Sequence, residues 1–151
     1  MYISNPSNKI IPIILSFPSS IAASNAVLRA KHGVLSGKGV FEVGGRTWEV
    51  SQGQLFFARP SQLIRYTADE QQPWEYSWVG FNGACAHKLA AQLPFTDDSP
   101  VHHTHDPDGM RAALANIYSS RGLQPQDEAA MVGYIYLFIA SLMKETSAGK
   151  P

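Results

Sequence analysis

The pattern of apolar and polar positions divides the chain into a β-rich first half and a helical second half. Within residues 39–83, short runs of Val, Phe, Tyr, Trp and Ile recur at regular spacing, separated by breaks rich in Gly, Ser, Gln, Asp and Pro. Strands this short cannot each bury a face alone, so we expect them to close on one another as a sandwich or barrel. After an apolar run at 26–35, the predicted strands are 40–43, 47–50, 54–58, 63–68 and 74–81.

The apolar period changes after residue 83, from the alternation of strands to the spacing of helices. Residues 84–93 place Cys85, Leu89 and Leu93 at steps of four, which predicts a short amphipathic helix. A short strand is expected at 101–104. The Asp-Pro-Asp sequence at 106–108 predicts the start of a second helix, ending near Gly122. A third helix is predicted over 127–145, with acidic residues near its positive end.

The middle of this third helix is apolar on nearly all sides. A helix that packs on one side only needs an apolar stripe of about 100°. The excess favours a second partner, and a symmetric subunit is the simplest one; the alternative is a helix buried deeply within its own domain. Under the first interpretation the residues expected at a homodimer interface are Tyr134, Leu137, Phe138 and Ser141.

Three prolines and many Ser and Asn residues characterise the first 25 residues. Proline fixes φ and removes a backbone donor, so this segment is predicted to be an extended arm with one edge strand at 10–15. Such an arm is suited to cover the mouth of a barrel. A partly ordered tail is the alternative.

Charge and composition exclude several classes of function. Twelve basic residues balance twelve acidic ones, so the totals show no basic face for a nucleic-acid backbone. The single cysteine, Cys85, excludes an internal disulfide and fits a reducing compartment. No secretory signal or membrane-spanning run is evident, so we expect a cytoplasmic protein.

The residues give weak support for an enzyme. The sequence HHTH at 102–105 offers histidines, but no third metal ligand is evident, and a polar surface loop is the simpler interpretation. Glu75 lies within a predicted strand, but nothing fixes a second carboxylate beside it. No phosphate-binding loop or nucleophile elbow occurs. We therefore expect no catalytic residue, no metal and no cofactor.

The motifs within 37–83 resemble a known family when their order is considered. SGKG leads into a hairpin, GQLFF-x-x-P forms a strand, Tyr-x-Ala-Asp follows, and PWEYSWVGFNG leads into a helix. This order is similar to the N-terminal effector-binding and dimerisation domain of AraC-type transcription regulators.

The resemblance implies a mainly β fold with C-terminal helices. The expected fold is a cupin-like β-barrel (a double-stranded β-helix or jelly roll) followed by two to three α-helices. Residues 1–25 would be the arm, 26–83 the effector-binding barrel and 84–146 the helical dimerisation segment. The implied partners are a small-molecule effector, commonly a sugar, and a second copy of the chain. DNA would be bound only by a helix-turn-helix domain that this chain lacks, and no membrane partner is implied.

The chain departs from the metal-binding pattern of cupins. The early strand offers only Ala30 and His32 near the expected inward positions, and Ile64 stands where a later histidine is expected. One histidine cannot make a three-ligand site, which disfavours a metal-dependent enzyme. A small metal-dependent cupin enzyme of isomerase or dioxygenase type is therefore only the second interpretation. A constitutive dimerisation module with a filled barrel is the third.

Alternation along the strands nominates the residues that would contact an effector. One register places Glu75 and Ser77 inward, and a slip of one residue exchanges them for Tyr76 and Trp78. The expected effector-binding residues are His32, Tyr66, Glu75 and Ser77, with Arg29 and Trp48 as secondary candidates and Tyr76 and Trp78 in the other register.

Overall fold

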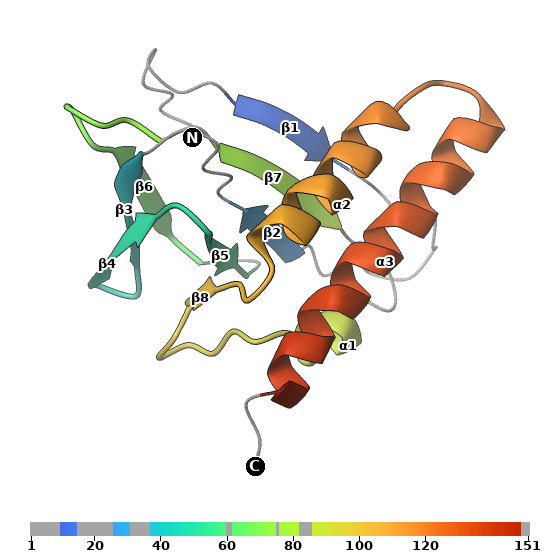
Figure 1. Cartoon of the computed structure of the whole chain (residues 1–151). Helices are drawn as coiled ribbons and strands as arrows, with labels where there is room; N and C mark the ends of the chain where they lie inside the picture. Colours follow the sequence, from blue (N-terminus) through green and yellow to red (C-terminus); the bar gives the residue numbers. More distant parts are fainter. Residues whose placement is uncertain are drawn as a thin grey trace.

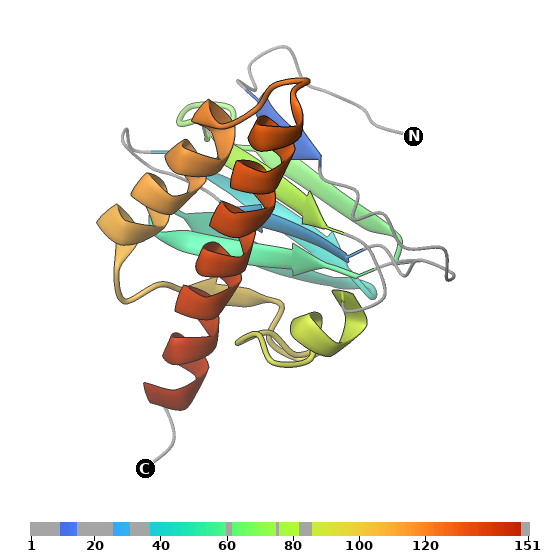
Figure 2. The same ribbon diagram turned by 90° about the vertical axis from the view of Figure 1, so that its right-hand side faces the viewer.

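The computed structural model describes residues 10–14, 26–30, 37–59, 62–74, 76–81 and 86–148. They form eight strands and three helices in three layers: a pair of helices, a five-stranded sheet and a three-stranded sheet (Figures 1 and 2). The elements are β1 (Ile10–Ile14), β2 (Ala26–Ala30), β3 (Lys38–Val43), β4 (Arg46–Ser51), β5 (Gln54–Ala58), β6 (Ile64–Ala68), β7 (Tyr76–Phe81), α1 (Ala86–Ala90), β8 (Val101–His103), α2 (Pro107–Ser119) and α3 (Pro125–Ala148).

The strands form two sheets. The larger sheet has the order β1-β7-β2-β5-β8, and the smaller one has the order β4-β3-β6. Every pair is antiparallel except β1 with β7. The predicted mainly β architecture with C-terminal helices is thus confirmed, while closure of the sheets into a cupin-like barrel stays a prediction. The expected strand at 10–15 is present as β1; the rest of the arm lies outside the described residues.

A tight hairpin joins β3 to β4, as the sequence predicts. Gly44 and Gly45 both have positive φ, at 59° and 75°, a conformation that favours glycine. Side chains of β3 alternate between buried and half-buried, so one face of the smaller sheet turns inward. Phe41, on that face, lies opposite Trp48 on β4 and Tyr66 on β6.

Two hydrophobic cores hold the three layers together, and β5 contributes to both. Phe56 packs between the sheets with Phe41, Val50 and Trp74. Gly39 allows this packing, because a Cβ there would overlap the Trp74 ring. On the opposite face of β5, Leu55 and Phe57 pack against the helices. The continuous apolar run of β5 therefore reflects a strand buried on both faces.

The helix boundaries differ from the predicted ones by a few residues. Asp106 caps α2 as expected, accepting a hydrogen bond of 2.9 Å from the Gly109 backbone N–H. The helix ends at Ser119 rather than near Gly122, with Ser120 as its C-terminal cap. Of the first predicted helix, 84–93, residues 84 and 85 lie outside the described residues, α1 is helical and 91–93 form turns and bends instead; α3 is longer than predicted at both ends.

One side of α3 is buried and the other exposes large apolar side chains. Ile135, Phe138, Ile139 and Leu142 are at most 2% exposed and pack into the core shared with α2 and the larger sheet. Leu137 is 65% exposed. Within the described part of the chain, no helix is long and apolar enough to span a membrane.

Candidate functional site

Two predicted effector-binding residues, Trp48 and Tyr66, lie on the inner face of the smaller sheet. Both are half-buried and flank Phe41 across the ladder. The Trp48 ring lies 6.4 Å from that of Phe41, and the Tyr66 ring lies 6.1 Å from that of Phe56. Tyr66 shares the inner face with Ile64, since Ile64 pairs with buried Val43. The structure thus brings Trp48 and Tyr66 to the edge of the space between the sheets.

The register of the larger sheet separates the remaining candidates. Arg29 on β2 is aligned with Phe56 on β5 and with Trp78 on β7, and Phe56 belongs to the core between the sheets. Ser77 is instead aligned with Ala30, which pairs with Leu55 of the helix-facing core. Arg29 and Trp78 therefore share the register position of Phe56, and Ser77 shares that of Leu55.

The structure says less about the position of the other candidates. Tyr76 is aligned with Ile10 of β1 and belongs to the same alternate set as Trp78. His32 and Glu75 lie outside the described residues. The register aligns Trp78, and not Ser77, with Arg29 and Phe56, while which of Glu75, Ser77, Tyr76 and Trp78 contact an effector stays a prediction.

Aromatic rings fill the centre of the space between the sheets. Phe56 stacks on Phe41 at 4.5 Å and on Trp74 at 6.0 Å, and all three side chains are at most 1% exposed. Packing of this kind leaves no room for a ligand at the position of these rings. A ligand bound between the sheets would therefore have to lie towards the ends of the strands, beyond the Phe41–Phe56–Trp74 stack.

A hollow of about 130 Å³ opens beyond the β3–β4 hairpin, where Val43, Arg46, Phe57 and Arg59 meet the segment 95–100. Arg46 begins β4 and Arg59 follows the end of β5. The sequence analysis missed this site. The usable signal in the sequence is an arginine directly before one predicted strand, at position 46, and another directly after the following strand, at position 59, a feature too common to be singled out.

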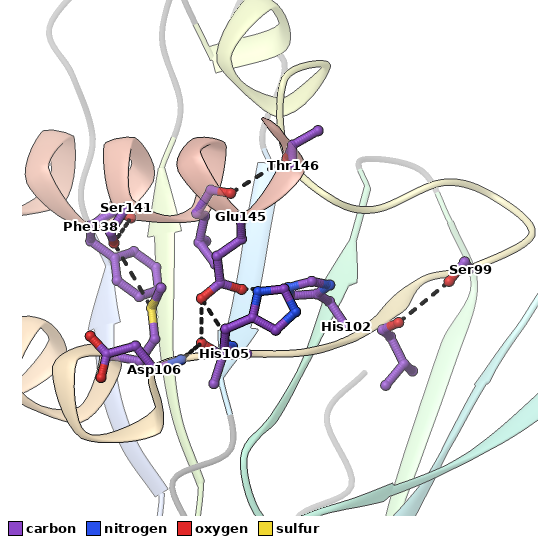
Figure 3. Close-up of polar contacts among 12 residues, drawn as sticks. Ser99, His102, His105, Asp106, Phe138, Ser141, Glu145 and Thr146 are labelled. Carbon is purple, nitrogen blue, oxygen red and sulfur yellow. Dashed lines mark hydrogen bonds and ion pairs between the residues drawn. The ribbon is translucent and has the colours of Figure 1, made fainter. Parts of the chain in front are cut away.

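A polar cluster joins the segment after β8 to the last turns of α3 (Figure 3). The Glu145 carboxylate lies 2.5 Å from His102 Nε2, accepts a hydrogen bond of 2.6 Å from the Thr104 hydroxyl, and accepts one of 3.3 Å from the His105 backbone N–H. The side chains of His102 and Glu145 are only 17% and 9% exposed. We call these four residues the β8–α3 latch.

The latch corrects the interpretation of HHTH as a polar surface loop. His102 and Thr104 face the helix and bind its carboxylate, whereas His103 and His105 are exposed. The described residues contain no group of three His, Cys, Asp or Glu side chains able to hold a metal ion. Sequence spacing cannot find the latch, because Glu145 lies about forty positions further along the chain.

Two further hollows lie on the surface. One, of about 480 Å³, lies between α2 and α3 and is lined by Met110, Tyr134 and Leu137 together with polar side chains such as Asn116 and Lys144. The other lies on the outer side of the smaller sheet beside Lys38 and Asp69. The Gln72 backbone N–H holds the pKa of Asp69 below its usual value, with smaller contributions from the Gln71 N–H and the Lys38 ammonium group.

The four expected interface residues occupy different environments on α3. Leu137 is exposed, and Tyr134 and Ser141 are half-buried along the hollow between the helices. Phe138 is fully buried in the chain's own core and is turned away from the exposed face. The expected inclusion of Phe138 is therefore corrected, because it lies about 100° around the helix axis from Leu137, on the side that packs into the core.

Comparison with known proteins identifies similar sequences. A family model described as an AraC-like ligand binding domain matches residues 32–139. The chain is 28% identical over 115 residues to the Msm operon regulatory protein of Streptococcus mutans, covering 76% of this chain and 41% of that protein. It is 22% identical over 116 residues to the lactose operon transcription activator of Staphylococcus xylosus, covering 76% and 42%. The chain thus spans less than half the length of these curated relatives.

Proposed function

Because the chain belongs to the family of AraC-like ligand-binding domains, we propose that it is the effector-sensing part of a bacterial transcription regulator. The family match over residues 32–139 carries this proposal, and it covers the smaller sheet, the strands β5, β7 and β8 of the larger sheet and most of the helical layer. In our proposal the effector is a small sugar or related metabolite, bound at the ends of a cupin-like barrel. The role is regulatory rather than enzymatic, and the output reaches DNA through a separate DNA-binding domain.

Two observations support a sugar as the effector. One relative is named as the transcription activator of a lactose operon, and lactose is a sugar; the other is named as an operon regulatory protein. In this chain, Trp48 and Tyr66 present half-buried rings at the edge of the space between the sheets. Ligand sites combine apolar ring faces with a few placed polar groups, and a sugar uses both.

A screen of mono- and disaccharides by thermal shift and calorimetry tests the effector proposal. A sugar present at about 100 times its dissociation constant is expected to stabilise the domain by about 2.7 kcal/mol. Tyr66→Phe, which keeps the ring and removes the hydroxyl, is expected to weaken binding about tenfold, since a hydrogen bond is lost. The matched control is Tyr136→Phe on the exposed part of α3. A panel without any stabilising sugar would contradict the proposal.

We further propose that two copies pair through the exposed side of α3, centred on Leu137. A large apolar side chain left 65% exposed on a 24-residue helix is the supporting observation. The buried side of the helix, with Phe138, would keep its contacts within the chain.

Leu137→Glu is expected to convert the dimer to monomer without unfolding it, because the side chain is exposed. Sedimentation equilibrium at micromolar concentration measures the association, and circular dichroism verifies the fold. Leu123→Glu is the matched control, since Leu123 is fully exposed between α2 and α3. A wild-type protein already monomeric at this concentration, or an equal effect of both substitutions, would exclude this interface.

A further inference from the structure

Two arginines from different strands border the hollow of about 130 Å³ at the hairpin end of the sheets. Each guanidinium lies over an aromatic ring: that of Arg46 is 5.7 Å from the Trp48 ring, and that of Arg59 is 5.5 Å from the Phe57 ring. Cation–π attraction at these distances helps to hold each guanidinium against its ring, and Arg59 Nη2 also donates a hydrogen bond of 3.4 Å to the Phe95 carbonyl. The two cations are therefore held in position by rings that belong to the cores.

Both arginines are occupied by carboxylates of one tight turn. Arg46 Nη2 lies 2.6 Å from Asp98 Oδ1, and Arg59 Nε lies 3.3 Å from Asp97 Oδ1. The turn is closed by reciprocal backbone hydrogen bonds of 3.1 Å between Thr96 and Ser99. Asp97 and Asp98 thus form the tip of a turn that presents two negative charges to the two arginines.

The two carboxylates are largely exposed to solvent. The Asp97 and Asp98 side chains are 82% and 86% exposed, whereas those of Arg59 and Arg46 are 33% and 57% exposed. Exposed ion pairs contribute little net stability, because water solvates the separated carboxylate well. Displacement of these carboxylates by another anion is therefore inexpensive. The arginines, stacked on their rings, would stay in place.

We propose that Arg46 and Arg59 form a binding site for an oxyanion, in which the Asp97–Asp98 turn is a built-in competitor. Arginine pairs recognise phosphate and carboxylate through two parallel N–H···O bonds, and two guanidinium groups suit a phosphate monoester dianion best. The hollow has room for a group of phosphate size, and Arg46 on its border connects it to the half-buried Trp48 ring, which lies 5.7 Å from that guanidinium. The effector class that fits both features is a phosphorylated sugar; this last step rests on the proposed function, whereas the anion site does not.

Calorimetric titrations at constant ionic strength test the anion site, with inorganic phosphate as the probe and sodium chloride as the reference. The wild type is expected to bind phosphate, and Arg59→Gln and Arg46→Gln are each expected to weaken binding about tenfold. The double substitution Asp97→Asn, Asp98→Asn is expected to tighten it by a similar factor, because the competitor is gone. Arg65→Gln is the matched control, since Arg65 pairs with Glu42 on the other face of the smaller sheet.

The outcomes separate the anion site from the effector assignment. Absence of phosphate binding in both the wild type and the Asp97→Asn, Asp98→Asn variant overturns the site and leaves the turn as a structural clasp only. Affinity unchanged by Arg59→Gln also overturns it. Glucose 6-phosphate binding more tightly than both inorganic phosphate and glucose supports a phosphorylated sugar. Equal affinities for the two phosphates overturn the sugar-phosphate assignment while the anion site stands, and neither result removes the regulatory role.

Discussion

Replacing Phe56 with alanine is expected to lower the free energy of unfolding by about 3–5 kcal/mol, as for other fully buried aromatic residues. The ring is 0% exposed and stacks on both Phe41 and Trp74. Its removal leaves a void that the two sheets cannot close, because β5 is also held on its other face by Leu55 and Phe57. Urea denaturation followed by circular dichroism measures the loss.

Two variants sharpen this test. Phe56→Leu keeps most of the volume and is expected to cost clearly less than the alanine substitution. Leu63→Ala, at a position 93% exposed, is expected to change the stability by less than about 0.5 kcal/mol. A loss below about 1 kcal/mol for Phe56→Ala would show that the rings are not tightly packed, and the centre of the sandwich would again be available to a ligand.

The sequence allowed the β-rich half to be predicted well because its signals are local. Glycines at the hairpin, alternation along 40–43 and the apolar run at 54–58 all depend on neighbours within a few residues. The order of motifs also identified the family, which the comparison with residues 32–139 confirms. The start of α2 was equally predictable, since Asp106 and Pro107 act within one helical turn.

What the sequence could not provide depends on contacts between distant residues. Whether Ser77 or Trp78 lies in the row of Phe56 is decided by pairing with β2, some fifty positions earlier, and alternation gives both answers equal weight. Phe138 and Leu137 are adjacent and both apolar, yet only packing against the sheet buries the former. The Arg46–Asp98 pair joins residues 52 positions apart and has no local signal.

Replacing Glu145 with alanine is expected to destabilise the domain by about 2–3 kcal/mol and to release the segment after β8 from α3. The substitution removes one acceptor group from three donors at once, and the Thr104 hydroxyl and the His102 ring are left buried without it. Unsatisfied buried polar groups cost about 1–3 kcal/mol each, which sets the magnitude. Lys144→Ala is the matched control, because Lys144 is the adjacent, exposed position on the same helix.

Hydrogen exchange shows which residues the substitution affects, whereas denaturation reports only the change in the stability of the whole domain. In the Glu145→Ala variant, the amides of 101–106 are expected to exchange faster, while those of the β3–β4 hairpin keep the rates of the wild type. Such a pattern is expected because Val101 packs against the core between the sheets and the next residue, His102, binds α3. The three-residue strand β8 thus connects the core between the sheets to α3. Uniformly faster exchange would instead mean that the latch supports the whole fold, and unchanged exchange at 101–106 would show that it holds nothing in place.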